Sequence, residues 1–467
     1  MTDIKHNCGF CVANTLHDTY SFIKSLQHRG REATGMVAIG DERIDVIKWE
    51  GPVNRFDITD LHKIFQSPNY HTYMAHVRYA TRGRKDQILE DAHPHVIGGR
   101  SEKMANLEVI LDCEMAIVHN GQIDSKYLSS VNPNLLTTGC DTEAFLHLFK
   151  EKGEREILKQ IPGSFTAAIA DKKRKEVIVM RDKTGIKPGV LGWKDGKYAV
   201  ASEEIAFRKN GGEFIEDLNP GSVYYLAPNG SYTKEKVIKQ DLKHCFFEWN
   251  YIGDFDSMLN GVSIRKVREA LGEVLAEEFN PEDADMVTYI PRCPEVAARS
   301  YSKETGIPFN PIFFKIRSER SFQGSTNTDR EISIKNNLHL LPDIKHELEG
   351  KTLVVIDDST VRGNNSKRAR DLLYEEGKVK KATLLNFTPP IGIIPADGIE
   401  RGCTYGVDMP PNDNFVARNR SLEEISEKIG IPVRYISFEG LLKAYRRVGL
   451  NKNKLCTFCI GGEKPFE

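Results

Sequence analysis

Residues 352–365, TLVVIDDSTVRGNN, join an apolar run to polar side chains that suit a phosphorylated sugar. The apolar part predicts a buried parallel strand, and the loop after it opens a helix-like segment whose backbone N–H groups can hold a phosphate. Asp357 and Asp358, at the carboxyl end of the strand, can accept hydrogen bonds from vicinal ribose hydroxyls or hold a hard cation such as Mg2+. The sequence therefore predicts a sugar-phosphate site at this strand end.

The whole string is a more specific signal than its two acids, because two adjacent aspartates usually lie in a solvated turn. The string resembles the phosphoribosyl pyrophosphate (PRPP) signature of type I phosphoribosyltransferases. This resemblance implies that the strand end and its loop bind PRPP, with Asp357 and Asp358 also available to Mg2+. The residues concerned are Asp357, Asp358, Ser359, Thr360, Val361, Arg362, Gly363, Asn364 and Asn365.

Cys8 follows a polar leader, residues 1–7, and is a candidate amino-terminal nucleophile. Removal of the leader would attach a base directly to the nucleophile, because a free α-amino group titrates near about 7.7–8.0 and an ordinary thiol near about 8.5. No histidine partner is then needed. We expect residues 1–7 to be removed.

Four further short strings follow Cys8 in the chain. Together with Cys8, their order resembles that of the N-terminal-nucleophile glutamine amidotransferases. Taken singly, each has a structural explanation: a surface ion pair for Arg78, a hairpin turn at Asn120 and Gly121, or a small core residue at Cys8. Their joint order favours the functional interpretation. The strings are QHRG at residues 27–30, AHVRYATRG at 75–83, HNG at 119–121 and CDTE at 140–143.

The resemblance implies a role in glutamine hydrolysis for each of five residues besides the nucleophile. Arg78 would bind the α-carboxylate of glutamine as a bidentate pair and Asp141 its α-ammonium, with Arg29 supporting the pocket. The Asn120 side-chain amide and the Gly121 backbone N–H would form the oxyanion hole, which usually dominates acyl-transfer catalysis.

Cys456 and Cys459 form a C-x-x-C pair whose two thiolates can face one metal ion. Cys245 and Cys403 stand in contexts that resemble the metal-containing subgroup of amidophosphoribosyltransferases, where four thiolates hold a 4Fe-4S cluster. The resemblance favours the cluster, whereas the spacing alone suits structural zinc equally well. Four unrelated buried thiols are the remaining alternative. In either metal case we expect a staple between the domain junction and the C-terminal tail, with no redox role.

Both halves together resemble the amidophosphoribosyltransferase (glutamine phosphoribosylpyrophosphate amidotransferase) family, in its iron-sulfur-containing subgroup, over nearly the whole chain from Cys8. The resemblance implies the glycosyltransferase that opens purine synthesis. Glutamine, PRPP and water would give 5-phosphoribosylamine, pyrophosphate and glutamate, with ammonia passed internally between two sites. It also implies Mg2+ and a 4Fe-4S cluster as cofactors, and a homotetramer inhibited by purine nucleotides.

The second half departs from the family pattern in its phosphate-binding loops. Arg292 and Cys293 stand where the family carries an acid and a hydroxyl, so they offer a base and a thiol where Mg2+ prefers oxygen. The flexible loop, residues 315–323, is shortened, and Arg320 and Lys335 remain as cations for PRPP. Two other departures are Gly253–Ser257 and Lys187, where the family has an arginine.

The elements that must position these residues divide the chain into two halves. In the first, short β-type runs alternate with polar turns and amphipathic helices, which predicts antiparallel α+β layers. From about Ser263, helices and strands alternate as in a doubly wound α/β domain. With the resemblance, this predicts a leader (1–7), a class II glutamine amidotransferase domain of αββα sandwich type (8–240) and a phosphoribosyltransferase domain with a cluster-binding tail (241–467). The boundary region is Leu218–Asp241.

Composition excludes several classes of partner. The 467 residues exceed one core, and 65 Lys and Arg against 66 Asp and Glu, with no basic stripe, argue against nucleic acid. No apolar run reaches the roughly 20 residues of a membrane span, and the polar start is unlike a signal peptide. We therefore expect a cytoplasmic protein, in which nine cysteines favour catalysis or metal binding over disulfides.

Three functional hypotheses remain open from the sequence. The leading one is a bifunctional amidotransferase that uses both glutamine and PRPP. In the second, the glutaminase site feeds ammonia to a different acceptor. In the third, a catalytically altered phosphoribosyltransferase-fold protein only senses PRPP or a nucleotide.

Overall fold

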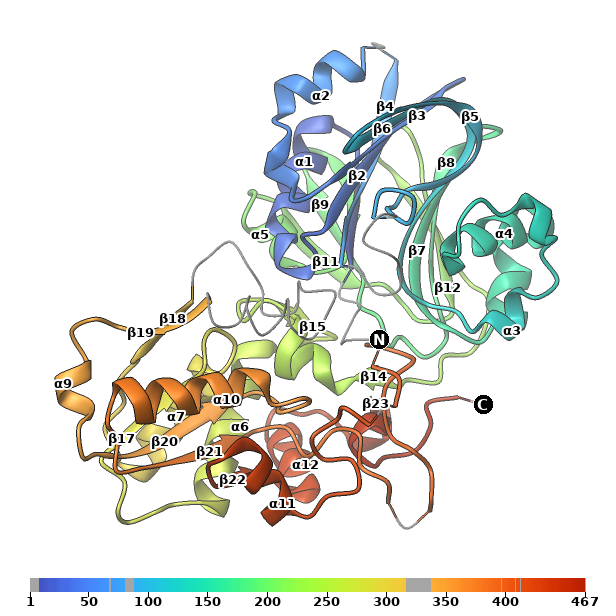
Figure 1. Cartoon of the computed structure of the whole chain (residues 1–467). Coiled ribbons are helices and arrows are strands. Elements are labelled where there is room, and N and C mark those ends of the chain that lie inside the picture. Colours follow the sequence, from blue (N-terminus) through green and yellow to red (C-terminus); the bar gives the residue numbers. More distant parts are fainter. Residues whose placement is uncertain are drawn as a thin grey trace.

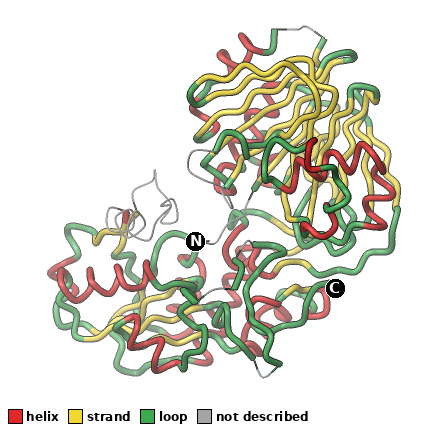
Figure 2. The backbone as a smooth tube through the Cα atoms, turned by 45° about the vertical axis from the view of Figure 1, so that its right-hand side comes forward, coloured by secondary structure: helices red, strands yellow, loops and turns green. Residues whose placement is uncertain are grey.

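The structure is a computed structural model that describes residues 8–66, 69–79, 88–315, 337–395, 397–407, 409–411 and 413–466. The predicted leader, Arg320 and Lys335 lie outside the described residues. Figure 1 shows two halves, a strand-rich one formed by the first part of the chain and a mixed one formed by the second. Figure 2 shows the same division, with strands filling the upper half and helices interleaved with strands in the lower.

An antiparallel sheet system forms the first half. Its strands follow one hydrogen-bonded path, β11-β9-β10-β1-β4-β2-β3-β6-β7-β8-β12-β13, with β5 paired to β6. The strands are β1 (Gly9–Ala13), β2 (Ala33–Gly40), β3 (Ile44–Glu50), β4 (Tyr70–Arg78), β5 (His95–Met104), β6 (Leu107–Gln122), β7 (Ser164–Asp171), β8 (Arg174–Arg181), β9 (Val190–Lys194), β10 (Lys197–Ala201), β11 (Glu213–Asp217), β12 (Ser222–Leu226) and β13 (Tyr232–Lys236).

Three apolar clusters divide this half into four layers. One cluster packs helices α1 (Leu16–Ser25), α2 (Ile58–Ile64) and α5 (Ile205–Arg208) on one sheet face. A second packs α3 (Ser125–Leu128) and α4 (Asp141–Gln160) on the opposite face, and a third lies between the two strand layers. Because strand side chains alternate between faces, each sheet buries one side against helices and the other against strands. The predicted αββα sandwich is confirmed.

Strand β6 joins the two strand layers. Its first part pairs with β3, as in the register of Val46 with Ile110. Its last part pairs with β7, where Gly121 lies opposite Phe165. The strand therefore carries Asn120 and Gly121 to the end of the second layer.

A four-stranded parallel sheet forms the core of the second half, in the order β17 (Met286–Tyr289), β20 (Thr352–Asp357), β21 (Lys381–Asn386) and β22 (Val433–Tyr435). Side chains of β20 alternate between two apolar clusters. Val354 and Ile356 belong to the cluster of α6 (Ile264–Glu278), α7 (Glu295–Thr305) and α12 (Phe438–Arg447). Leu353 and Val355 belong to the cluster of α9 (Lys345–Leu348), α10 (Asn364–Asp371) and α11 (Leu422–Ile429). The buried parallel strand predicted for the apolar part of residues 352–365 is confirmed, and it spans Thr352–Asp357.

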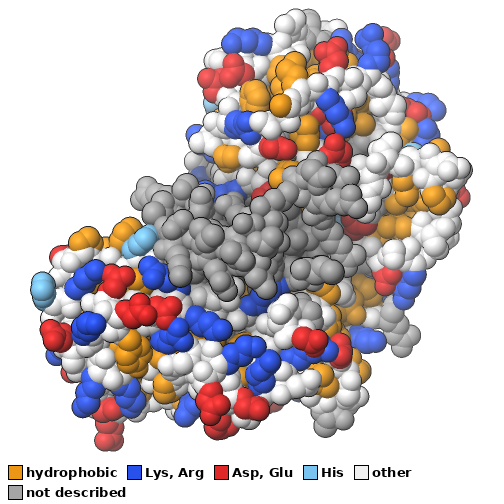
Figure 3. All heavy atoms as spheres, viewed as in Figure 1, with side chains coloured by type: hydrophobic (Ala, Val, Ile, Leu, Met, Phe, Trp, Pro, Cys, Tyr) orange, Lys and Arg blue, Asp and Glu red, His pale blue; other side chains and the backbone are white. Residues whose placement is uncertain are grey.

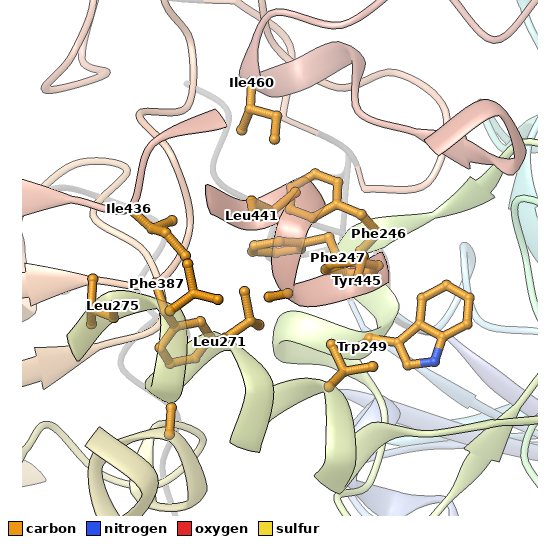
Figure 4. Close-up of a cluster of buried hydrophobic side chains, with 14 of the residues drawn as sticks. Phe246, Phe247, Trp249, Leu271, Leu275, Phe387, Ile436, Leu441, Tyr445 and Ile460 are labelled. Carbon is orange, nitrogen blue, oxygen red and sulfur yellow. The ribbon is translucent and has the colours of Figure 1, made fainter. Parts of the chain in front are cut away.

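The larger of these clusters extends to the junction between the halves. Figure 4 shows Phe246, Phe247 and Trp249, from the segment that enters the second half, packed beside Leu441 and Tyr445 of α12. The Tyr445 hydroxyl donates to the Phe246 carbonyl at 2.6 Å. Burial of these large side chains fixes the junction segment to the second half.

Three pairs of short strands lie outside the two main sheets, and the pair β14–β23 lies at the junction. β14 (His244–Cys245) pairs in parallel with β23 (Leu455–Cys456), while β15 (Met258–Leu259) pairs with β16 (Val262–Ser263) and β18 (Phe313–Lys315) with β19 (Leu338–Leu340). The expected boundary region, Leu218–Asp241, carries β12 and β13, so the sandwich continues to Lys236. The exact boundary at 240/241 stays a prediction.

The surface shows mixed charge on the face seen in Figure 3, where Lys and Arg side chains are interspersed with Asp and Glu over both halves. Within the described ranges, no helix combines the length and the apolar character that crossing a bilayer requires.

Candidate functional site

Cys8 lies buried at the start of β1, a central strand that pairs with β4 and β10. Burial raises the pKa of its thiol, while the Tyr79 backbone and the positive charges of Arg78, Lys187 and Arg29 act in the opposite direction. The nucleophile predicted from the sequence is therefore surrounded by cationic groups, which favour a thiolate during reaction.

Arg78 and Asp141 come from different elements, and both lie near Cys140. Arg78 ends β4, and its guanidinium contacts Asp91 Oδ2 at 3.2 Å. Asp141 begins α4, and its Oδ2 accepts from the Ile123 N–H at 3.0 Å. Both charges act on the Cys140 thiol, whose pKa rises to about 12 through burial and Asp141 and is lowered by Arg78. A cation and an anion that both lie near the same thiol can hold the two charges of a zwitterionic amino acid.

Asn120 and Gly121 close the β6 strand in a buried setting. Among the described residues, neither polar atom of the Asn120 side chain has a hydrogen-bond partner. A buried amide without partners is costly, so it suits a ligand oxygen. Gly121 has φ 152°, and a Cβ there would lie 2.0 Å from the Ser164 carbonyl, so no other residue fits. The sequence pattern predicted both positions.

Arg29 is fully buried and connects the nucleophile to the second half. Its Nε donates to the Cys8 carbonyl at 3.0 Å, and its Nη2 lies 3.1 Å from both carboxylate oxygens of Glu248. Its Nη1 pairs with Glu203. Both carboxylates are buried, so their charges are compensated inside the protein.

Two further residues complete this buried network. His28 lies 2.8 Å from Glu203, and the Lys187 ammonium lies 3.7 Å from Glu248. Burial alone would raise the pKa of Glu203, but His28 and Arg29 lower it below its ordinary value. Sequence analysis missed Glu203 and Glu248, because no local pattern marks a partner that lies more than 170 positions away.

A cavity of about 800 Å³ lies at the carboxyl end of the parallel sheet, where α/β folds hold ligands. Residues 357–366, from the last residue of β20 into α10, line it, and so do His28 and Arg31 of the first half. Asp357 and Asp358 are 7% and 8% exposed. Burial raises the pKa of both carboxyls, to about 6 for Asp358, and Asp357 is raised further by its neighbour's charge.

The loop after β20 is held in shape by its own hydrogen bonds. Ser359 Oγ donates to Asp358 Oδ1 at 2.6 Å, and Thr360 Oγ1 donates to Asn386 Oδ1 at 2.7 Å. Gly363 precedes α10 with φ 79°, and a Cβ there would lie 2.2 Å from Ile429 Cδ1. The loop thus presents the first turn of α10 to the cavity, as phosphate binding requires.

The remaining predicted loop residues also lie at the cavity. Val361, Arg362, Asn364 and Asn365 line it. The buried Oδ1 of Asn365 has no hydrogen-bond partner within the described ranges, so it is available to a ligand.

Arg292 and Cys293, the unusual pair after β17, lie at the same cavity but in different settings. The Cys293 thiol donates to the Asn250 carbonyl at 3.0 Å, so it is engaged with the protein. Arg292 is exposed. A planar, permanently charged donor at the mouth of the cavity can bind phosphate oxygens.

The four predicted metal-binding cysteines come together at the junction. Cys245 lies opposite Cys456 in the β14–β23 pair, Cys459 lies in the following turn (Phe458–Ile460), and Cys403 forms an isolated bridge with Met409. All four are buried. Burial raises the pKa of each thiol. The charges of the other cysteines raise the pKa further at Cys245, Cys456 and Cys459. A bound cation would lower these pKa values again.

The spacing of the four thiols differs from that of a zinc site. Among the described residues, which include all four cysteines, no three of these thiols lie within 4.8 Å of one another. Four thiolates on one zinc ion, with Zn–S bonds of about 2.3 Å, would lie about 3.8 Å apart.

Comparisons with known proteins agree along nearly the whole chain. The family described as "Glutamine amidotransferase domain" matches residues 109–209. Amidophosphoribosyltransferases of Archaeoglobus fulgidus and Bacillus subtilis are 31% and 30% identical, with 96% of this chain covered in each case and 94% and 91% of those proteins. The structure of glutamine PRPP amidotransferase from B. subtilis complexed with ADP and GMP matches with a TM-score of 0.80 and 28% identity, covering 98% of this chain and 97% of that one. The chain belongs to the amidophosphoribosyltransferase family, as the sequence predicted.

Proposed function

We propose that the protein transfers ammonia from glutamine to PRPP, giving 5-phosphoribosylamine, pyrophosphate and glutamate. One observation carries this proposal beyond family membership. The short turn Gln27–Arg29 and the residues after it serve both sites, because Arg29 donates to the Cys8 carbonyl while His28 and Arg31 line the cavity of the PRPP loop. We infer that ammonia released at Cys8 passes along this shared segment to the second site.

In the glutamine site, the Cys8 thiolate attacks the amide carbon of glutamine. The α-amino group of a mature Cys8 takes the thiol proton and returns it to the leaving ammonia. The partnerless Asn120 amide and the Gly121 N–H hold the oxyanion, while Arg78 and Asp141 hold the α-carboxylate and α-ammonium. Water then attacks the glutamyl thioester, which releases glutamate and restores the thiol.

In the PRPP site, ammonia attacks the anomeric carbon as pyrophosphate leaves. The loop 358–365 and the first turn of α10 bind the 5-phosphate, and Asp357 and Asp358 bind the ribose hydroxyls or Mg2+. Two buried carboxyls whose pKa values are raised by burial fit a divalent cation, because the cation would offset their charge. When bound, Mg2+ would neutralise charge on the leaving pyrophosphate.

The cysteine quartet fits a 4Fe-4S cluster better than zinc. In such a cluster each thiolate binds its own iron, so the sulfurs lie further apart than around one zinc ion. Cys245, Cys403, Cys456 and Cys459 would hold it. When bound, the cluster would link the segment after the sandwich to the C-terminal tail.

A product assay tests the proposed function. Glutamine and PRPP together should yield glutamate and pyrophosphate in equal amounts, whereas PRPP alone should yield no pyrophosphate beyond spontaneous hydrolysis. Glutamate without pyrophosphate would favour a different acceptor for ammonia, and neither product would favour a sensor.

A Cys8→Ala protein separates the two sites. It should lose glutamine-dependent synthesis yet keep synthesis driven by added ammonia, because the PRPP loop lies in the other half of the molecule. A Cys113→Ser protein, altered at a buried thiol of the same half, is the matched control and should keep both activities. Loss of both activities in Cys8→Ala alone would contradict the two-site mechanism.

A further inference from the structure

Two histidines and a cysteine form a compact buried cluster that the proposed mechanism does not use. His93 and His95 flank Pro94 at the start of β5, and Cys140 precedes α4. One ligand atom from each residue lies within 4.8 Å of the other two. Within the described ranges this is the group of three whose spacing suits a metal ion.

His95 has an imidazole nitrogen that is available to a metal ion. It is 4% exposed, and its Nε2 has no hydrogen-bond partner among the described residues. A buried imidazole nitrogen without a partner is costly, so its presence beside two further ligand atoms points to a bound ion.

Cys140 also occupies a place where a thiol has little structural use. It is the N-cap residue of α4, a position that favours Ser, Thr, Asp or Asn, and its side chain makes no capping hydrogen bond. The thiol makes a long contact of 3.8 Å with Asp141 Oδ1 and also faces the hydroxyl and the backbone N–H of Thr142. Because a metal-bound thiolate can still accept hydrogen bonds, these contacts leave its sulfur available to a metal.

We propose that His93, His95 and Cys140 bind one divalent transition-metal ion of the Zn2+ class, with a fourth position open to water. Two imidazole nitrogens and one thiolate suit Zn2+ and other borderline metals, whereas Mg2+ and Ca2+ prefer oxygen ligands. The site is separate from the cysteine quartet, since it lies in the sandwich half.

The charges around the cluster accommodate such an ion. Arg78 is paired with Asp91, and Asp141 adds one more negative charge next to Cys140. These three side chains carry a net charge of −1. Adding a Cys140 thiolate and a divalent ion brings the sum to zero, so the metal would offset charge rather than create it.

Binding requires one rearrangement, at His93. Its Nδ1 accepts from the His119 N–H at 3.2 Å, and its Nε2 lies 3.2 Å from Thr142 Oγ1. Coordination through Nε2 would replace its contact with Thr142 and move the ring proton to Nδ1, which would break the hydrogen bond from the His119 N–H. Thr142 would keep its partner His119 Nδ1 at 2.9 Å. The loss is two neutral hydrogen bonds, which together are weaker than binding of a structural metal ion.

The ion would act as a clamp beside the glutamine site. It would tie the start of α4, which carries Asp141, to the start of β5. Arg78 lies near all three ligands, so the clamp would hold Asp141 in the same neighbourhood as Arg78. Resting on the proposed function, this predicts a higher KM for glutamine without the ion and unchanged ammonia-driven synthesis.

Metal content tests the site without reference to activity. Full-length protein is loaded with Zn2+, dialysed against metal-free buffer and analysed for zinc per chain. Cys140→Ser and His95→Phe proteins should retain one zinc ion fewer than the unmodified protein. The matched control is Cys113→Ser, another buried thiol of the same half, which should retain the full amount. Equal zinc in all four proteins would overturn the proposal.

A second measurement uses the unmodified protein, so a variant that fails to fold does not leave the question open. Alkylation of Cys140 by iodoacetamide is followed by peptide mass spectrometry with and without Zn2+. Zinc should slow modification of Cys140 at least tenfold and leave Cys113 unchanged. Equal rates at Cys140 would overturn the site, whatever the outcome of the glutamine and PRPP assays.

Discussion

Cys8 depends on its environment as much as on its sequence position. Arg29 holds its carbonyl and cationic groups surround its thiol, but no side-chain base was predicted for it. The α-amino group can fill that role only if residues 1–7 are removed. We therefore expect intact-mass measurement of active enzyme to give a chain that begins at Cys8. Fully active protein that retains the leader would exclude the amino-terminal nucleophile.

Arg292 is the residue through which this chain departs most from its family at the PRPP cavity. Cys293 is engaged with the Asn250 carbonyl, so we expect the neighbouring guanidinium to bind the pyrophosphate. Arg292→Ala should cost about 1.5–3 kcal/mol in kcat/KM for PRPP, roughly 10- to 150-fold. Glutaminase activity without PRPP should not change.

The matched control for Arg292 is Arg299, which lines the same cavity but pairs with Glu295 at 2.8 Å. Arg299→Ala should have the smaller effect, because its charge is already compensated. The double change Arg292→Asp with Cys293→Ser should steepen the dependence of PRPP use on Mg2+. Unchanged PRPP kinetics in these variants would show that the loop does not touch the pyrophosphate.

Asp358 links the stability of the ligand-free protein to pH. Because burial raises its pKa to about 6, the folded protein binds this proton more tightly than the unfolded chain, whose aspartates titrate near about 3.9. Its contribution to the free energy of unfolding therefore falls as the pH rises from about 4 to about 6.

We expect Asp358→Asn to stabilise ligand-free protein above pH 6, by up to about 3 kcal/mol, and to have no such effect near pH 4. Thermal unfolding across this pH range measures the difference. Asp343→Asn, at an exposed position outside the cavity, should show no comparable change. A constant difference between Asp358→Asn and unmodified protein at all pH values would contradict the assignment.

At the scale of elements, Gly363 couples the PRPP loop to the packing of α10 against α11. A Cβ at this position would meet Ile429 of α11 at 2.2 Å, in a left-handed conformation that also disfavours alanine. Gly363→Ala should lower the melting temperature and raise the KM for PRPP.

Gly350 provides the matched control, because it is also left-handed, with φ 71°, but has nothing within 4 Å of a Cβ. Gly350→Ala should show only the backbone cost, about 1 kcal/mol, and an unchanged KM. Equal effects of the two substitutions would mean that the contact with α11 is unimportant for the loop.

Local sequence patterns predicted those elements in which buried residues recur at regular spacing. The strand Thr352–Asp357 was predicted from its apolar run, and the antiparallel strands of the first half from their alternating pattern, whereas the αββα arrangement was implied by the family resemblance. Strand β13, YTKEK, was not predicted as a strand and was assigned to the boundary region. Its residues are polar, and no periodicity of buried residues marks it. The Arg29–Glu248 contact spans 219 positions, so only the folded chain reveals it.

The contacts of Lys187, which stands where the family has an arginine, also join residues distant in sequence. It is fully buried, and its ammonium contacts the Gly406 carbonyl and Glu248. Gly406 in turn approaches Cys245, since a Cβ there would lie 2.9 Å from its sulfur. Sequence could identify the departure from arginine but not this connection between the glutamine half and the cysteine quartet.

At the scale of the whole molecule, the cysteine quartet is expected to hold the two ends of the second half together. Protein purified without oxygen should be brown, with four iron and four sulfide per chain. Cys245→Ser should lose the colour and unfold at a lower temperature, because the junction would lose its link to the tail. Ammonia-driven turnover per folded molecule should be retained.

Two other results would change this assignment. A colourless protein with one zinc ion held by the quartet would exclude the cluster but keep the four ligands. Protein without any metal that unfolds at the same temperature as Cys245→Ser would exclude a metal at the junction altogether.

The parallel pairing of β14 with β23 has a consequence for how the protein is made. β14 leaves the ribosome early in the synthesis of the second half, but its partner strand β23 follows all four strands of the parallel sheet and helix α12. The sandwich can fold while translation continues, because all its strands precede residue 237. The β14–β23 pair can form only after the helices and parallel strands of the second half have been synthesised. Any ion or cluster that needs all four thiolates must therefore bind after this half has left the ribosome, when Cys459 is in place.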